Sequence, residues 1–168
     1  MDPQRAEWPS MQFCRDRKVS RRGDPAKDEI PGWTILMADD DPDDYLLVKE
    51  ALEKAGFRVD LRLVSDGEEL MDYLQECSRH ANEEVACRPS LILLDLNMPR
   101  KDGRDTLREI KSHPDLKTIP IAVFTTSKDV DDMTACYNAG ADLYVTKPNS
   151  FESLVETMAA LGKDWLGV

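Results

Sequence analysis

The chain has 168 residues, 41 % of them hydrophobic, which is enough for one packed domain plus a short extension. No apolar run approaches the ~18 residues that a membrane-spanning helix needs, and the N-terminus lacks the apolar stretch of a signal peptide, so we expect a cytoplasmic protein with no membrane segment. The formal net charge of −11 argues against binding to nucleic acid and is compatible with a protein partner or a bound cation.

The first thirty residues differ in composition from the rest of the chain. They contain seven Lys or Arg and six Asp or Glu, a balance of +1, so the remaining residues carry −12. Pro3, Pro9, Gly23 and Pro25 interrupt this segment, and it shows no apolar periodicity. We therefore predict a disordered N-terminal extension at residues 1–30, followed by one domain at residues 31–168.

From residue 33 onward, short apolar runs alternate with amphipathic stretches. Strands are predicted at residues 33–38, 59–64, 91–94, 121–124 and 143–145, and helices at residues 43–56, 67–79, 103–112, 129–139 and 150–165. Gly56 and Gly140 are expected to end two of the helices, and residues 80–90 to form a surface loop. Continuous apolar strands with intervening helices predict a parallel sheet covered on both faces, an α/β fold.

Polar residues directly follow the apolar runs of the predicted strands. They are Asp39, Asp40 and Asp41 after the first strand, Asp95 after the third, Thr125 after the fourth and Lys147 after the fifth. In open α/β sheets, ligands bind outside the carboxyl ends of the strands. Several carboxylates brought together repel one another, so a cation is the natural counter-charge, and oxygen ligands favour Mg²⁺ or Ca²⁺.

The aspartate run divides between a helix start and a candidate metal site. Asp41 and Pro42 are typical of a helix N-terminus, where Asp43 and Asp44 are favourable in the first turn. Asp39 and Asp40 are left for a metal, with a solvated acidic helix start as the alternative. The pattern is not an EF-hand loop, because it lacks the required glycine. A lysine, a hydroxyl, a metal and a nucleophilic carboxylate together are the groups that stabilise a phosphoryl group in transfer.

These residues resemble the receiver domain of bacterial response regulators, the CheY-like family. The matching motifs are the run Ile35 to Pro42, the run Leu91 to Pro99 with Gly103 beyond, Phe124 to Ser127, and Gly140 to Pro148. They occur in order over about four-fifths of the chain. The resemblance implies a doubly wound, flavodoxin-like sheet of five parallel strands in the order 2-1-3-4-5.

The resemblance also implies a role for each site residue. Asp95 matches the phosphoacceptor, and Asp39 and Asp40 match the acidic pair that holds Mg²⁺, with Asp40 the direct ligand and Asp39 acting largely through water. The backbone carbonyl of Asn97 would complete the metal shell. The other three matches are Thr125, the hydroxyl that moves toward the phosphoryl group, Tyr144, the aromatic switch residue, and Lys147, which pairs with the phosphate and whose bond to Pro148 is cis in the family.

Within the family, the Asp-rich start and the run from Asp95 to Gly103 are most similar to single-domain regulators paired with bacterial phytochrome kinases. The expected partner is a sensor histidine kinase or a phosphotransfer protein. We expect no room for an output domain after the last helix, so signalling would occur by protein contact or onward phosphotransfer. The chain would then catalyse no reaction other than its own phosphorylation and dephosphorylation. The candidate docking face, for a partner protein or for a second copy of the chain, consists of residues 129–139, 143–145 and 150–165.

Two alternative functions stay open at this point. An aspartate-nucleophile phosphatase would carry Asp-x-Asp, whereas Leu96 and Asn97 follow Asp95. A degenerate receiver, acting as a non-phosphorylated interaction module, would have lost one of the site residues, and all are present. The cysteines Cys14, Cys77, Cys87 and Cys136 form no Cys-x-x-Cys pair, so free thiols are predicted.

Overall fold

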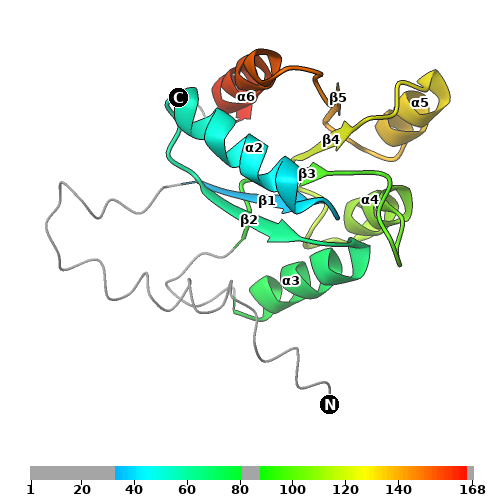
Figure 1. Ribbon diagram of the computed structural model, residues 1–168. Coiled ribbons are helices and arrows are strands. Elements are labelled where there is room, and N and C mark those ends of the chain that lie inside the picture. The colour runs from blue at the N-terminus through cyan, green and yellow to red at the C-terminus, as the bar shows by residue number, and fades with distance from the viewer. Residues whose placement is uncertain (1–32, 81–87, 166–168) are drawn as a thin grey trace, which may run out of the picture.

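A computed structural model of the protein describes residues 33–80 and 88–165. Strands and helices alternate along these ranges (Figure 1). Their bounds are β1 Thr34–Ala38, α2 Pro42–Lys54, β2 Asp60–Val64, α3 Gly67–Arg79, β3 Leu91–Leu94, α4 Gly103–Ser112, β4 Ile121–Thr125, α5 Val130–Asn138, β5 Leu143–Thr146 and α6 Phe151–Trp165. Every predicted element is confirmed to within two residues. The predicted extension at residues 1–30 and most of the predicted loop at residues 80–90 lie outside the described residues.

The strands form one parallel sheet in the order β2-β1-β3-β4-β5, which confirms the predicted fold. Every residue of β1, β3 and β4 is buried, as expected for central strands of a parallel sheet with helices on both faces. The order reverses between β1 and β3, so the carboxyl ends of these two strands border the crevice in which this fold class binds ligands.

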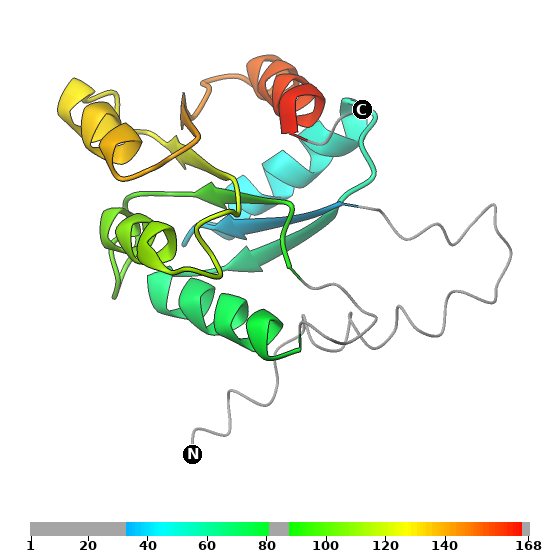
Figure 2. The same cartoon turned by 180° about the vertical axis from the view of Figure 1, so that it is seen from behind.

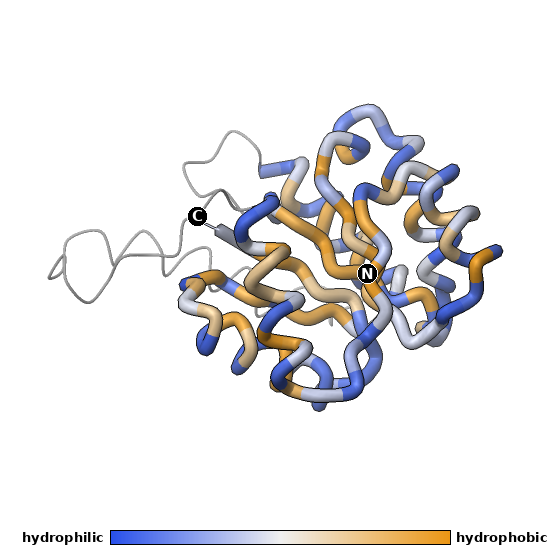
Figure 3. Tube along the Cα trace, turned by 90° about the horizontal axis from the view of Figure 1, so that it is seen from above, coloured by the Kyte–Doolittle hydropathy of each residue, from blue (hydrophilic) through white to orange (hydrophobic). Residues whose placement is uncertain are grey.

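Two apolar cores lie on opposite faces of the sheet. On one face, α2 and α6 pack against each other and against the sheet through residues such as Val48, Leu52, Leu154 and Met158. On the other face lie α3, α4 and α5 (Figure 2), where Leu70 and other apolar side chains form the second core. The hydropathy of the chain follows this layering, with apolar residues on the strands and on the inner sides of the helices (Figure 3). No helix within the described ranges has the length and apolar character needed to cross a membrane.

Aspartates begin four of the helices, all at the same edge of the sheet. The side chains of Asp41, Asp66, Asp102 and Asp129 cap α2, α3, α4 and α5, each accepting a hydrogen bond from a backbone N–H of the first turn. Because each helix follows its strand, the helix N-termini surround the carboxyl ends of the strands. Their partial positive charge favours anionic groups at this edge.

Glycines end two of the helices, as predicted. Gly56 follows the last residues of α2 with φ of 89°, and Gly140 follows α5 with φ of 105°. A residue with a side chain adopts this left-handed conformation only at a cost, so glycine is the residue that lets the chain turn back toward the next strand.

Candidate functional site

The sheet itself positions the backbone of the site residues. Beyond the last residues of the strands, the Asp39 N–H donates to the Val64 carbonyl at 3.0 Å, and the Asp95 N–H donates to the Ala38 carbonyl at 3.0 Å. The Lys147 N–H donates to the Thr125 carbonyl at 2.7 Å. These bonds continue the parallel ladder past the strands, so the side chains leave a rigid edge at a set spacing.

Three carboxylates converge at this edge. One oxygen from each of Asp39, Asp40 and Asp95 lies within 4.8 Å of the others. Asp39 and Asp95 are buried, whereas Asp40 is exposed. Burial raises the pKa of Asp39 to about 6, although the hydrogen bond from Lys147 acts in the opposite direction. A group of oxygen ligands with one open side suits a hard divalent cation, and such an ion would favour the charged form of Asp39.

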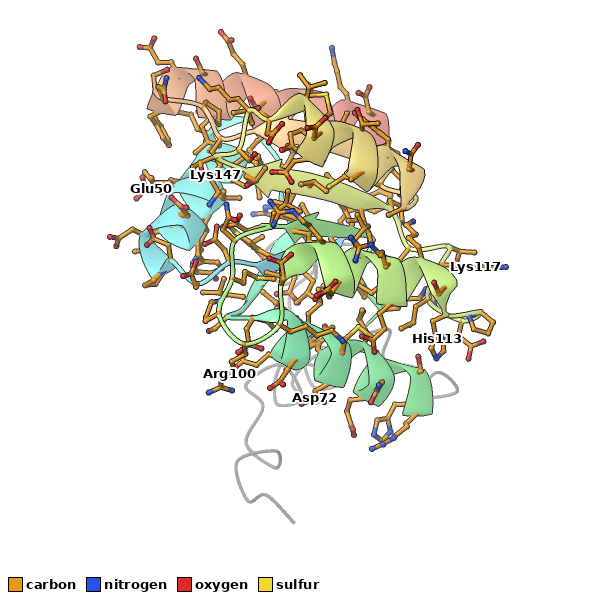
Figure 4. The ribbon with its side chains drawn as sticks, turned by 90° about the vertical axis from the view of Figure 1, so that its right-hand side faces the viewer. Glu50, Asp72, Arg100, His113, Lys117 and Lys147 are labelled. Atoms are coloured by element: carbon orange, nitrogen blue, oxygen red, sulfur yellow. The ribbon has the colours of Figure 1, made fainter. Side chains whose placement is uncertain are left out.

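Lys147 is surrounded by acceptors. Its Nζ donates to Asp39 Oδ2 at 2.7 Å, to Asp44 Oδ2 at 2.7 Å and to Asp95 Oδ2 at 3.2 Å. Burial alone would lower the pKa of Lys147, but the bonds to Asp39 and Asp44 and the charge of Asp95 outweigh it, so the pKa lies above its ordinary value. The lysine is therefore a fixed positive charge, and Figure 4 shows it close to α2.

Asp44 was not predicted to belong to this site. Its position in the first turn of α2 predicts a favourable interaction with the helix dipole, and nothing in the linear sequence pairs it with Lys147, 103 residues away. The N-cap of α2 is the sequence signal that could have placed Asp44 near the site. Because Asp41 caps the helix, Asp44 lies in the first turn of α2, at the helix N-terminus that follows β1. Asp39, Asp40, Asp44 and Asp95 with Lys147 carry a formal charge of −3.

The loop after β3 wraps closely around Asp95. The Asn97 N–H donates to Asp95 Oδ1 at 3.2 Å, which places the Asn97 backbone beside the carboxylate. At Gly103 the chain returns so closely that an added Cβ would lie 2.1 Å from the Asp95 carbonyl oxygen. Only glycine allows α4 to begin against the backbone of Asp95.

Thr125 and Tyr144 are linked through Ser127. Thr125 is buried at the end of β4, and its Oγ1 accepts from the Ser127 N–H at 3.3 Å. Tyr144 is also buried, and its Oη donates to the Ser127 carbonyl at 2.9 Å. Burial raises the pKa of Tyr144, so the phenol is neutral at physiological pH. The two predicted switch residues thus contact the same short segment.

One expectation from the resemblance is wrong. The bond between Lys147 and Pro148 is trans, since the described residues include no cis peptide bond. Trans is the intrinsically favoured isomer even before proline, and Lys147 reaches its three carboxylate partners with the chain in this form. The prediction of free thiols holds for Cys77 and Cys136. Cys14 and Cys87 lie outside the described residues.

A five-stranded sheet in this order, with three carboxylates and a lysine at its carboxyl edge, defines the receiver class of signalling proteins. The model of the response regulator receiver domain family matches residues 35–159. The chain therefore belongs to the response regulator receiver family.

The similar proteins include response regulators of known structure. Response regulator Rcp1 of Synechocystis sp. is 40 % identical over 136 residues, which is 81 % of this chain and 90 % of Rcp1. The crystal structure of the phosphorylated cyanobacterial phytochrome response regulator RcpA matches with a TM-score of 0.70 at 39 % identity, covering 80 % of this chain and 94 % of RcpA. RPA3017, a response regulator in red light signaling of R. palustris, matches with a TM-score of 0.72 at 34 % identity and the same coverage, 80 % and 94 %.

Proposed function

We propose that this protein accepts a phosphoryl group on Asp95 from a sensor histidine kinase, with Mg²⁺ bound by Asp39, Asp40 and Asp95. The observation that carries the proposal is the convergence of those carboxylates with the Lys147 ammonium at one buried edge of the sheet. The RcpA structure is of a phosphorylated regulator, and a crystal structure of Rcp1 contains Mn²⁺. Both relatives support a metal-assisted phosphoryl transfer for this chain.

Each group has a distinct part in the reaction. A carboxylate oxygen of Asp95 attacks phosphorus, the bond from phosphorus to the donor nitrogen or oxygen breaks, and the donor leaves with the electron pair. Mg²⁺, when bound, supplies a Lewis acid that offsets charge on the phosphoryl oxygens. Lys147 stabilises the same charge, and the Asn97 carbonyl would complete the metal shell. Thr125 accepts from Ser127 but keeps its own O–H, which can donate to a phosphoryl oxygen.

We propose a phytochrome-type histidine kinase or a phosphotransfer protein as the partner, and protein contact rather than nucleic-acid binding as the output. The net charge of −11 disfavours nucleic acid. The docking surface would be the face of α5, β5 and α6, on which Val130 is 70 % and Tyr137 45 % exposed. Trp165 is a weaker candidate for this surface, because it is half-buried against the core under α6. A second copy of the chain could dock there too, which sedimentation of the phosphorylated protein would reveal.

Phosphorylation by a small donor tests the central proposal. The full chain is incubated with acetyl phosphate and Mg²⁺, and intact-mass spectrometry follows the adduct. We expect one phosphoryl group that is stable in acid and labile in base. Asp95→Asn should abolish it, and so should chelation of the metal. An adduct that survives Asp95→Asn would overturn the assignment, and no adduct on the wild type would favour the non-phosphorylated interaction module.

Asp44 offers a second test of the same site. Asp44→Asn removes a negative charge next to the Lys147 ammonium, so an anionic donor should meet less repulsion and phosphorylate Asp95 about three- to tenfold faster at low donor concentration. Asp43→Asn is the matched control, because Asp43 is exposed in the same first turn and has the same charge. Equal rates for the two variants would show that the contact with Lys147 has no kinetic role.

A further inference from the structure

Helix α5 has little apolar anchorage. Of its nine residues only Cys136 is buried, with Met133 partly buried against the same core. Val130 and Tyr137 are exposed. By contrast, α3 and α4 on the same face of the sheet bury five and four residues. The position of α5 must therefore depend more on polar contacts than that of its neighbours.

The strongest of these contacts joins α5 to the start of α4. Arg104 Nε donates to Asp132 Oδ1 at 2.8 Å, and Arg104 Nη2 donates to Asp132 Oδ2 at 2.8 Å. This is a bidentate pair, the geometry in which arginine and carboxylate bind most strongly. The side chains are only 28 % and 20 % exposed. The hydrogen bond from Arg104 lowers the pKa of Asp132 to about 2, so the pair is fully charged at neutral pH.

On the α4 side, Arg104 of this pair lies close in sequence and in space to the proposed phosphoacceptor loop. Arg104 Nη1 also donates to Asp102 Oδ2 at 3.1 Å, and Asp102 caps α4. The intervening Gly103 lies against the Asp95 carbonyl and donates its N–H to the Leu96 carbonyl at 3.0 Å. The backbone at Asp95 is therefore linked to Arg104 by direct contact, over one residue of chain.

At the other end, the pair reaches both switch residues. Ser127 Oγ donates to Asp132 Oδ2 at 2.7 Å. The N–H of the same serine donates to Thr125 Oγ1, and its carbonyl accepts from Tyr144 Oη. Asp132 thus holds Ser127, which is hydrogen-bonded to both Thr125 and Tyr144.

We propose that Arg104 and Asp132 are positioning residues that couple the phosphoacceptor loop to α5 and to the Thr125–Tyr144 switch. The coupling rests on the proposed phosphorylation of Asp95. It provides a second connection from Asp95 to the docking face, through α4, in addition to the direct approach of Thr125 to the phosphoryl group. Since the pair can be broken without opening an apolar core, α5 can move while the sheet keeps its structure.

Hydrogen exchange measured by mass spectrometry tests the coupling in the full chain, with and without acetyl phosphate. Arg104→Met removes the pair, and Asp132→Asn removes its charge and its bidentate geometry, because an amide has one acceptor oxygen, which could still accept from Ser127. In the unphosphorylated protein we expect exchange in residues 126–139 to rise about five- to tenfold. After phosphorylation the wild type should change its exchange in these residues, and both variants should lose most of that change. Their double mutant should resemble either single one.

Two matched controls remove charge without touching the pair. Arg108→Met disrupts an exposed pair with Asp105 on the same helix as Arg104. Asp131→Asn changes the exposed neighbour of Asp132 in the same first turn. Both should alter exchange in residues 126–139 much less than Arg104→Met does. Arg104→Lys, which keeps the charge but not the bidentate geometry, should fall between the wild type and Arg104→Met.

The possible outcomes separate this inference from the proposed function. If the variants raise exchange by the same factor with and without phosphorylation, the pair is merely structural and the coupling is refuted. The same follows if the controls act like Arg104→Met. If the wild type takes up no phosphoryl group, the proposed function fails. In that case the unphosphorylated samples still decide whether the pair holds α5.

Discussion

Helices α5 and α6 flank the last strand of the sheet but are held in different ways. The fifteen residues of α6 bury Leu154, Met158, Leu161 and Gly162 and pack against α2. The nine residues of α5 bury Cys136 alone and are held by Arg104, through Asp132, and by a bond between the Tyr137 hydroxyl and β5. Apolar contact is lost only when a core opens, whereas a single ion pair can be broken while the core stays closed. The difference suits α6 to a fixed position on the sheet and α5 to a position that can change.

The largest expected difference comes from truncating the α6 core. Met158 is fully buried, so Met158→Ala should lower the free energy of unfolding by about 2–5 kcal/mol. Val130→Ala on α5 removes an exposed side chain and should change it by less than about 0.5 kcal/mol. Urea denaturation of both variants checks the contrast. Similar losses would mean that α5 is anchored by apolar packing as firmly as α6.

A substitution at Gly103 should disturb the contact between the Asp95 backbone and the start of α4, next to Arg104. The Cβ of Gly103→Ala would meet the Asp95 backbone, so α4 must shift, with a loss of about 1–3 kcal/mol. The shift should also slow phosphorylation of Asp95 and raise hydrogen exchange in α5, because Arg104 moves with α4. Ser112→Ala, at the exposed end of the same helix, is the control. Unchanged exchange in α5 would show that Arg104 does not transmit the displacement.

Two tyrosines allow a matched comparison of the helices on either side of the sheet. The Tyr137 hydroxyl accepts from the Tyr144 N–H of β5 at 3.1 Å, and the Tyr45 hydroxyl of α2 donates to the Leu61 carbonyl of β2 at 3.1 Å. Each change to Phe should cost about 0.5–1.5 kcal/mol. Only Tyr137→Phe should raise exchange throughout its own helix, because α2 keeps its buried residues Val48, Ala51 and Leu52. Equal local loosening of α2 and α5 would contradict the comparison.

The smallest effect expected is the pH dependence of the Arg104–Asp132 pair. Folding lowers the pKa of Asp132 to about 2 from 3.8, so its stabilising contribution is present above pH ~4 and is lost as the pH falls below it. The wild type should therefore exceed Asp132→Asn in urea midpoint at pH 7, and the gap should close as the pH falls from about 4 toward about 2. A gap that stays constant over this range would mean that charge is not what holds the pair.

Most of the fold could be predicted because its signals are local. Runs such as Leu91 to Leu94 are short and apolar throughout, which favours buried strands, and Gly56 and Gly140 mark helix ends through their own conformational freedom. The site residues at strand ends were predicted for the same reason, since a parallel sheet brings all its carboxyl ends to one edge. The isomer of the peptide bond before Pro148 was not predicted correctly. Both the cis and the trans isomer are accessible before proline, and the surrounding structure selects one.

The sequence by itself determined the order of elements, the two-sided burial of the sheet and the collection of Asp39, Asp40, Asp95, Thr125 and Lys147 at one edge. These follow from periodicity and from the geometry of parallel strands. Tertiary structure alone decided which partners the charges choose. Asp44 contacts Lys147 from 103 residues away, and Arg104 contacts Asp132 across 28 residues. The chain has 33 Asp and Glu for 22 Lys and Arg, so acidic residues compete for basic partners. Only the packing of α2 on the sheet and of α5 beside α4 sets which pairs come within bonding distance.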